Sequence, residues 1–140
     1  MRQRIDWCVL PILALAAAGC EKLPAAPPLP DVPPTASFFF NPVSPIYAGQ
    51  TQVAFNASAS RDSDGSIVSY LWSFGDGTNP VTTTQPGVAH VFVPNGARCL
   101  NVTYGVSLAV TDNGGAVTLV SLPVTVTELP APGTLACLGQ

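Results

Sequence analysis

Two short polar segments of this chain carry residue types that could bind a metal ion. One holds Asp62 and Asp64 in the sequence DSDG, and the other holds Asp112 and Asn113. Carboxylate and amide oxygens are the ligands that calcium prefers. An EF-hand needs further ligands and a distal Glu, whereas residues 66–68 lead straight into a predicted strand, so that motif is rejected. What remains is a calcium hypothesis, with turn-capping carboxylates as the alternative.

The chain has one histidine, His90, and it sits beside a short predicted strand. A serine hydrolase needs a nucleophile, a base and a group that orients the base, and the sequence contains no Gly-x-Ser-x-Gly elbow. A zinc site fails on ligand count. We therefore predict no catalytic residue and, calcium aside, no cofactor. His90 is expected to make a structural hydrogen bond near Trp72.

The elements that must position these residues are short strands. Apolar residues alternate with a period of two in several segments that are separated by turn residues, and no helical period follows the N-terminal region. This spacing predicts an all-β sandwich of antiparallel strands. Val68, Tyr70, Trp72 and Phe74 are expected on the inward face of one strand. The predicted strands cover residues 36–40, 52–58, 68–74, 90–93, 104–110 and 120–126, with 78–87 a loop or short edge strand.

The segment from Phe55 to Gly77 combines ASAS, DSDG and the run YLWSFGDG. It resembles the signature of the PKD domain, an immunoglobulin-like β-sandwich of about seven strands named after polycystic kidney disease. The resemblance covers roughly residues 35–127. Ser73 departs from it, because the family usually has Asp there. The residues that carry the signature are Asp62, Asp64, Gly65, Tyr70, Trp72, Phe74, Gly75, Asp76, Gly77, His90 and Tyr104.

The resemblance implies structural roles for most of these residues. Trp72 is expected at the centre of the core, and Asp76 is expected to cap its own turn between two conformationally free glycines. In this fold the turn with Asp112 and Asn113 lies at the same end as the DSDG segment, and Asp76 lies at the opposite end. Relatives in bacterial collagenases bind calcium on a PKD domain. The calcium hypothesis is therefore kept for the end that holds the DSDG segment and the turn with Asp112 and Asn113.

The N-terminus has the pattern of a secretion signal. Two arginines precede an apolar run over 7–18, which is shorter than the ~20 residues of a membrane-spanning helix. The sequence Ala17-Ala18-Gly19-Cys20 resembles a bacterial lipobox, which implies a signal peptide over 1–19 and an acylated, palmitate-bearing Cys20. The residue after Cys20 is Glu21. An Asp at this position would resemble an inner-membrane retention signal, and its absence favours the outer membrane. The alternative is an ordinary secretory signal and a secreted protein.

The remaining segments flank the expected domain. Residues 20–34 are rich in proline and predict an extended linker after the lipidated cysteine. Residues 128–140 form a C-terminal tail. Cys99 precedes one strand of the last hairpin and Cys137 follows the other, so both emerge at the same end of the sandwich. A Cys99–Cys137 disulfide is therefore predicted in an oxidising compartment, with two free thiols as the alternative.

Charge limits the classes of partner. Charged residues make up 9% of the chain and the formal net charge is −3, compared with ~25% charged residues in an average protein. No basic patch exists in the sequence, so nucleic-acid binding is set aside. Tyr47 and the run 38–40 are the candidate exposed aromatics. The resemblance implies a non-catalytic binding or adhesion module for a protein or polysaccharide. A passive envelope component, or an accessory substrate-binding subunit of a secreted hydrolase, is the alternative.

Overall fold

The computed structural model of the chain describes residues 27–94, 96 and 100–129. Within these ranges seven strands form and no helix is present, which confirms the predicted all-β fold. None of the described segments is therefore a helix of the length and apolarity needed to cross a membrane. The strands are β1 (Phe39–Asn41), β2 (Gln52–Asn56), β3 (Ile67–Ser73), β4 (Val81–Thr83), β5 (Gly87–Val91), β6 (Asn101–Asp112) and β7 (Val117–Thr127).

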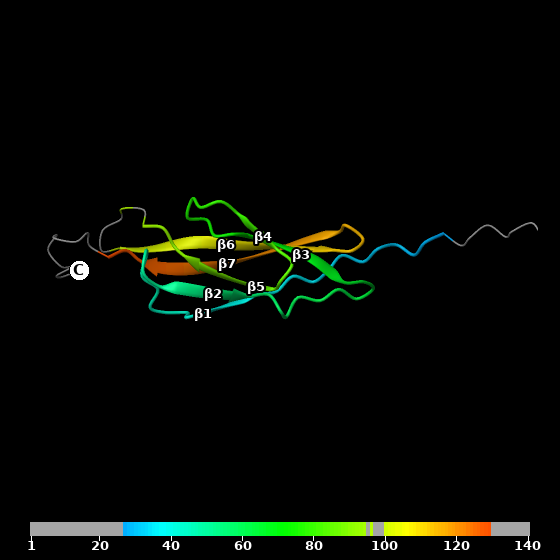
Figure 1. Ribbon diagram of the computed structural model, residues 1–140, viewed down its shortest axis with the longest axis horizontal. Coiled ribbons are helices and arrows are strands. Elements are labelled where there is room, and N and C mark those ends of the chain that lie inside the picture. The colour runs from blue at the N-terminus through cyan, green and yellow to red at the C-terminus, as the bar shows by residue number, and fades with distance from the viewer. Residues whose placement is uncertain (1–26, 95, 97–99, 130–140) are drawn as a thin grey trace, which may run out of the picture.

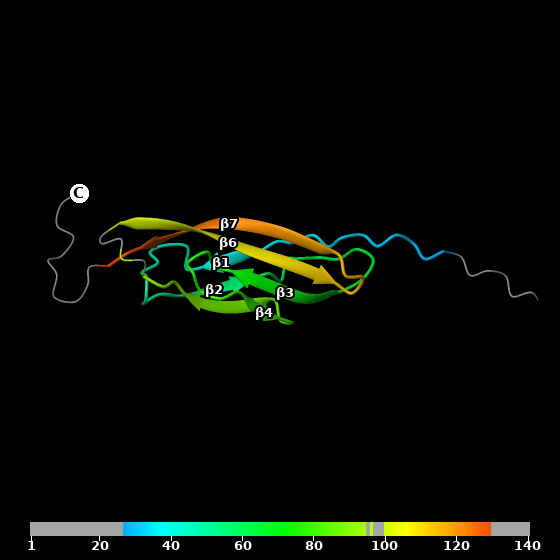
Figure 2. The same cartoon turned by 90° about the horizontal axis from the view of Figure 1, so that it is seen from above.

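The strands form two antiparallel sheets that face each other. One sheet has the order β1-β2-β5, and the other has the order β4-β3-β6-β7 (Figure 1). Figure 2 shows the larger sheet from a second side, with β7, β6, β3 and β4 in sequence across it. The longest pairing joins β6 to β7 from Asn101 opposite Thr127 to Thr111 opposite Val117.

The core between the sheets is built around aromatic rings. Phe55 of β2 is 1% exposed and Trp72 of β3 is fully buried, with their ring centroids 5.9 Å apart. The Phe55 ring also lies 5.3–6.4 Å from four other phenylalanine rings, within the usual range of aromatic pairs. Those four are Phe38, Phe40, Phe74 and Phe92. One side chain of the smaller sheet thus contacts rings that come from both layers.

Strand alternation places most of the expected residues inward, with one exception. Tyr70, Trp72 and Phe74 are buried, but Val68 is 45% exposed. The pairing of β3 with β6 shifts register between Ile67 and Ser69, and this bulge turns Val68 outward while Ile67 packs against the core. The expectation for Val68 was wrong because a bulge inserts one residue and reverses the alternation beyond it.

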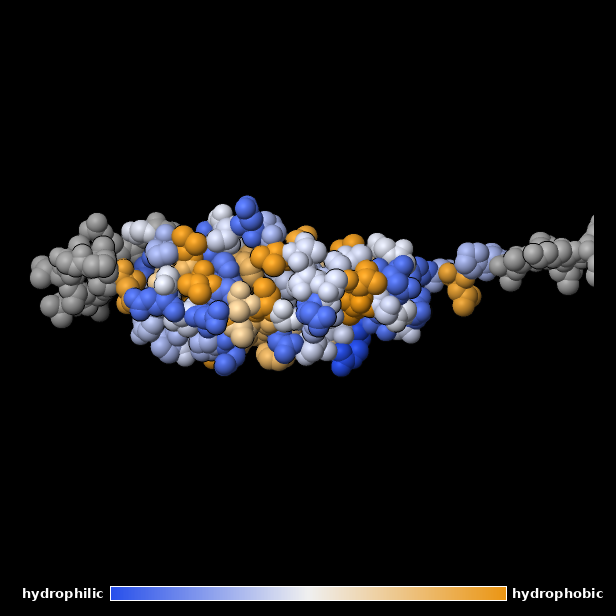
Figure 3. All heavy atoms as spheres, in the orientation of Figure 1, coloured by the Kyte–Doolittle hydropathy of each residue, from blue (hydrophilic) through white to orange (hydrophobic). Residues whose placement is uncertain are grey.

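The two described ends of the chain lie at opposite ends of the sandwich. The segment that precedes β1 leaves at the end where the β6–β7 hairpin turns, and β7 ends at the far end (Figure 1). There, Ile46 and Ala48 bond to Thr127 through the backbone, so they cover the last residue of this edge strand. The face shown in Figure 3 has small apolar groups separated by polar residues, without one continuous apolar area.

Several predictions fall outside the described residues. Cys20, its acylation and the signal peptide precede residue 27, and Cys99 and Cys137 lie in the undescribed ranges 97–99 and 130–140. The lipid anchor and the disulfide therefore remain predictions.

The position of Phe55 among five rings yields a stability prediction. Replacing Phe55 with Ala should lower the free energy of unfolding by about 3–5 kcal/mol, because the ring is lost and a cavity is left. Phe39→Ala is the matched control: Phe39 is 54% exposed, and its replacement should change stability by about 0.5 kcal/mol or less. Denaturant unfolding of both variants tests this, and equal losses would contradict the packing described.

Candidate functional site

Asp76, in the loop after β3, forms the densest polar network described. Its Oδ1 accepts hydrogen bonds from the Thr78 hydroxyl at 2.6 Å and the Thr78 amide at 3.2 Å. Its Oδ2 lies 2.8 Å from His90 Nε2 and accepts a bond from the Val93 amide at 3.0 Å. The Asp76 side chain has no exposed surface. This carboxylate therefore caps its own turn and also ties the β3–β4 loop to β5 and the residues after it.

The glycines around Asp76 make this loop possible. Gly75 and Gly77 have φ values of +76° and +88°, a region that other residues rarely occupy. A Cβ on Gly75 would lie 2.9 Å from the carbonyl oxygen of Gly105 on β6. Glycine at 75 thus allows the loop to turn while its backbone lies directly against β6.

The same network changes the acidity of Asp76. Burial alone would raise the pKa of this carboxyl group. Hydrogen bonds from Thr78, His90 and the Val93 amide favour the ionised form and together outweigh burial, so the pKa falls from 3.8 to about 2. Asp76 is therefore a carboxylate throughout the ordinary pH range.

His90 is bound on two sides. Its Nε2 is bonded to Asp76, and its ring stacks on Phe74 with 3.8 Å between centroids and 2° between planes. His90 thus makes a structural hydrogen bond, as expected, and its partner is Asp76. Only 12% of the His90 side chain is exposed. An imidazole held in this way serves structure, because little of it is open to a substrate.

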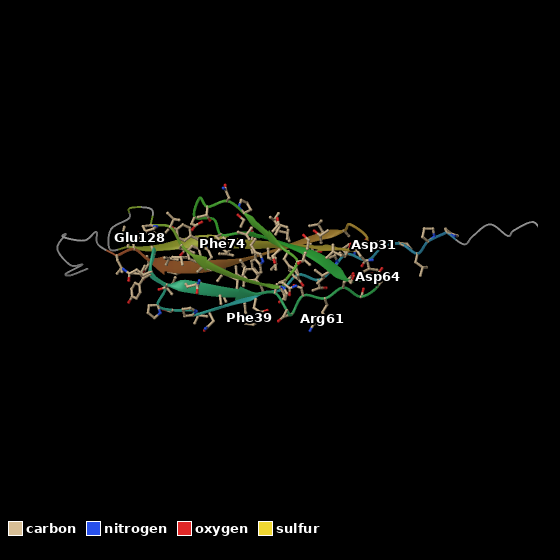
Figure 4. All side chains as sticks on the ribbon, in the orientation of Figure 1. Asp31, Phe39, Arg61, Asp64, Phe74 and Glu128 are labelled. Atoms are coloured by element: carbon tan, nitrogen blue, oxygen red, sulfur yellow. The ribbon has the colours of Figure 1, made fainter. Side chains whose placement is uncertain are left out.

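Tyr104 and Glu128 complete this end of the sandwich. The Tyr104 hydroxyl lies 3.5 Å from the carbonyl oxygen of Val93. Burial first, and then the negative charges of Glu128 and Asp76, raise the pKa of Tyr104. Glu128 is only 2% exposed, and Figure 4 shows it at the end opposite Asp31 and Asp64. The sequence offered no signal for a buried acid there, because Glu128 follows the last strand in what was expected to be the tail.

The opposite end collects the carboxylates of the calcium hypothesis. The Asn113 side-chain oxygen accepts bonds from the amide and hydroxyl of Ser66, which joins the DSDG turn to the β6–β7 hairpin. A Cβ on Gly65 would collide with the side-chain oxygens of Asn113 and Asp62, so both side chains lie directly against this glycine. Asp64 accepts a bond from the amide of Val32 at 3.0 Å. The predicted residues therefore lie at one end of the sandwich, and Figure 4 shows Asp64 of this set beside Asp31 of the linker.

One member of this acidic end was not predicted. Asp31 of the linker lies against Gly114 of the hairpin, so that a Cβ on Gly114 would collide with its carboxylate. Burial first, and then repulsion from Asp112, Asp64 and Asp62, raises the pKa of Asp31. Its position in a proline-rich segment gave no sign that it would fold back onto the domain.

The described carboxylates at this end are not grouped in threes, and Asp64 and Asp112 are engaged in capping backbone amides. Asp112 is 2% exposed, its Oδ1 caps the amide of Ala116 at 2.8 Å, and its Oδ2 has no hydrogen-bond partner among these residues. No three His, Cys, Asp or Glu side chains within residues 27–94, 96 and 100–129 are grouped so that they could hold an ion. The calcium hypothesis stays a prediction.

The two sheets and their connections define an antiparallel immunoglobulin-like β-sandwich. Residues 31–127 match the family model of the PKD domain, and the chain belongs to this family. Four of the signature residues, Gly75, Asp76, Gly77 and His90, form the loop and hydrogen-bond network described above.

The chain is also similar to named proteins and to solved structures. The chain is 34% identical over 79 residues to "Collagenase ColA" of Bacillus cereus, which is 56% of this chain and 7% of that protein. It resembles a solved structure of carbohydrate-binding modules of the β-sandwich superfamily, with a TM-score of 0.61 and 37% identity over 71% of this chain and 36% of the other. The PKD1 domain of Vibrio anguillarum Epp is 27% identical, with a TM-score of 0.53 over 72% of this chain and all of that domain. The chain thus spans a small part of the collagenase.

The low pKa of Asp76 predicts a specific acid sensitivity. Because the folded-state pKa lies below the unfolded value of 3.8, the group stabilises the fold above about pH 4 and loses this contribution as the pH falls towards 2. The loss should be roughly 2 kcal/mol. Asp76→Asn should remove this part of the pH dependence, as measured by denaturant unfolding at pH 2–6. A variant that retains the full wild-type slope would contradict the network.

Proposed function

We propose that this chain is a non-catalytic module that binds another macromolecule outside the cytoplasm. The main support is the exposed outward face of the β1-β2-β5 sheet. Every second residue of these strands is directed outward, and none of the outward residues is ionisable. Such a face has nothing to offer acid–base chemistry, whereas it is open along its whole length to an extended ligand.

Two further observations support binding over catalysis. The one histidine of the chain is stacked on Phe74 and only 12% of its side chain is exposed, so little of its ring can contact a substrate. Collagenases and carbohydrate-binding modules are among the proteins to which the chain is similar. These relatives favour a protein or polysaccharide as ligand, with the chain as a substrate-binding accessory or an adhesion module.

The proposal includes attachment to a bacterial envelope. Cys20 follows a short apolar segment and small residues, as a lipidated cysteine does, and the proline-rich linker would hold the domain away from the bilayer. The outer membrane is favoured over secretion. A passive structural role in the envelope is the second candidate, and it differs from the first by requiring no ligand.

Binding is tested with the full-length chain and purified envelope fractions, polysaccharides and gelatin. We expect saturable binding to at least one of these materials, with a dissociation constant in the micromolar range that is typical of weak modules. Heat-unfolded protein is the control for non-specific adsorption. Linear, non-saturable uptake on every material would contradict a binding function and favour a passive structural role.

The anchor is tested by intact mass of protein isolated from native membranes, with and without reduction. We expect a chain that starts at Cys20, carries three acyl groups, and gains the mass of two hydrogens on reduction if Cys99 and Cys137 are bonded. An unmodified chain with another N-terminus would refute the anchor, and a mass unchanged by reduction would refute the disulfide.

A further inference from the structure

The outward face of the three-stranded sheet has a composition of its own. Three side-chain amides lie on it, and we call it the amide face after Asn41, Gln52 and Asn56. Strand pairing arranges it in rows: Phe39, Asn56 and Gly87 lie opposite one another, and Asn41, Ala54 and Ala89 form the next row. Gln52 follows beyond Ala54 on β2.

Phe39 is the exposed aromatic of this face. In the run 38–40, Phe38 packs on Trp72 and Phe40 on Phe55, while Phe39 is 54% exposed on the outer side. Figure 4 shows Phe39 at the periphery of the domain on β1. Alternation along a strand forces this orientation, because its two neighbours are committed to the core. One flat apolar ring is thus presented beside amide groups.

The amides are placed within reach of a single group stacked on Phe39. Asn56 is directly opposite Phe39 in the ladder, at about 5 Å between Cβ atoms, and Asn41 lies two residues along the same strand, about 7 Å away. Asn56 Oδ1 accepts the Ser58 amide at 2.8 Å, which fixes the side chain and leaves its NH₂ group directed elsewhere. A fixed side chain loses less freedom on binding.

Apart from Val91, which lies opposite Gln52 and is 38% exposed, the rest of the amide face is a low floor. Gly87, Ala54 and Ala89 carry at most a methyl group and are exposed. A Cβ on Gly87 would meet only the carbonyl oxygen of Phe55, at 3.9 Å, so the space above is open. A ligand can therefore approach the strands closely beside the Phe39 ring.

This chemistry selects one class of ligand. An amide group both donates and accepts hydrogen bonds, as sugar hydroxyls do, and an aromatic ring covers the apolar C–H face of a sugar. No charge is present to attract a nucleic acid or an acidic polymer. The alanine and glycine floor offers little apolar area to a protein partner, whose interface would need a larger apolar centre.

We propose that the amide face binds an uncharged polysaccharide, with Phe39 stacked on a sugar ring and Asn41 and Asn56 bonded to its hydroxyls. This inference rests on the proposed binding function and assigns it a surface and a ligand class. The ligand lies on the β1-β2 side of the sheet and extends over the floor formed by β5.

The test is a binding assay of the full-length chain on cellulose, chitin, a neutral β-glucan, alginate and gelatin. We expect saturable binding to at least one neutral polysaccharide. Phe39→Ala should weaken it about tenfold or more, and Ala89→Arg should weaken it by obstructing the floor. Leu119→Ala is the matched control, since Leu119 is an exposed apolar residue of the other sheet at 67% exposure, and it should bind as wild type. Thermal unfolding confirms that each variant is folded.

Other outcomes would overturn the assignment of the amide face as a neutral-polysaccharide site. They can be told apart from failure of the proposed binding function. Binding lost in Leu119→Ala but retained in Phe39→Ala would move the site to the other sheet. Arg61 follows β2 and donates hydrogen bonds to the carbonyl oxygens of Ser58 and Ser60. Binding to gelatin alone, or to alginate in a manner abolished by Arg61→Ala, would replace the neutral ligand with a protein or an acidic polymer. In each of these cases the chain remains a binding module. Only the absence of saturable binding to every material removes the proposed function as well.

Discussion

The contact on which the fold depends is the meeting of Phe55 and Trp72 between the sheets. Phe55 comes from the middle of the smaller sheet, and its ring lies near five others that include Trp72 of the larger sheet. A sandwich of this size has a thin core, so a few large rings supply much of the buried apolar area. Strand alternation then determines the outer surface, because each inward ring fixes the direction of its neighbours.

The two ends of the sandwich use acidic residues in opposite ways. Asp76 is surrounded by donors, which stabilise its charge and lock the loop to β5. Asp31 is placed among other carboxylates, which destabilise its charge. One end therefore keeps the Asp76 carboxylate charged throughout the ordinary pH range, and the other holds the linker by contacts that compete with repulsion.

Much of the fold was predictable because it follows from alternation and turn residues, which are local signals. Tyr70, Trp72 and Phe74 are inward as predicted, and the hairpin turn after Asp112 forms where expected. Val68 was mispredicted because a bulge depends on the pairing of two strands and is invisible in one strand.

The sites were harder to predict because they depend on register. Asp76 bonds to a residue 14 positions away, and Asp31 returns from a segment with no strand pattern. The amide face could not be recognised either: its members come from three strands, and only the pairing shows that Phe39 lies opposite Asn56.

The distribution of charge determines how the two ends and faces of the domain respond to ionic strength. Dissolved salt screens charges, and the Debye length is only about 8 Å at physiological concentration. On the outward side of β1, β2 and β5 there is no charge to screen, so contacts made there are indifferent to salt. At the acidic end, where Asp31 approaches Asp64 and Asp112, salt weakens the repulsion and draws the linker closer. The same domain therefore combines an uncharged outward face, whose contacts do not depend on ionic strength, with an acidic linker junction whose contacts are favoured by salt.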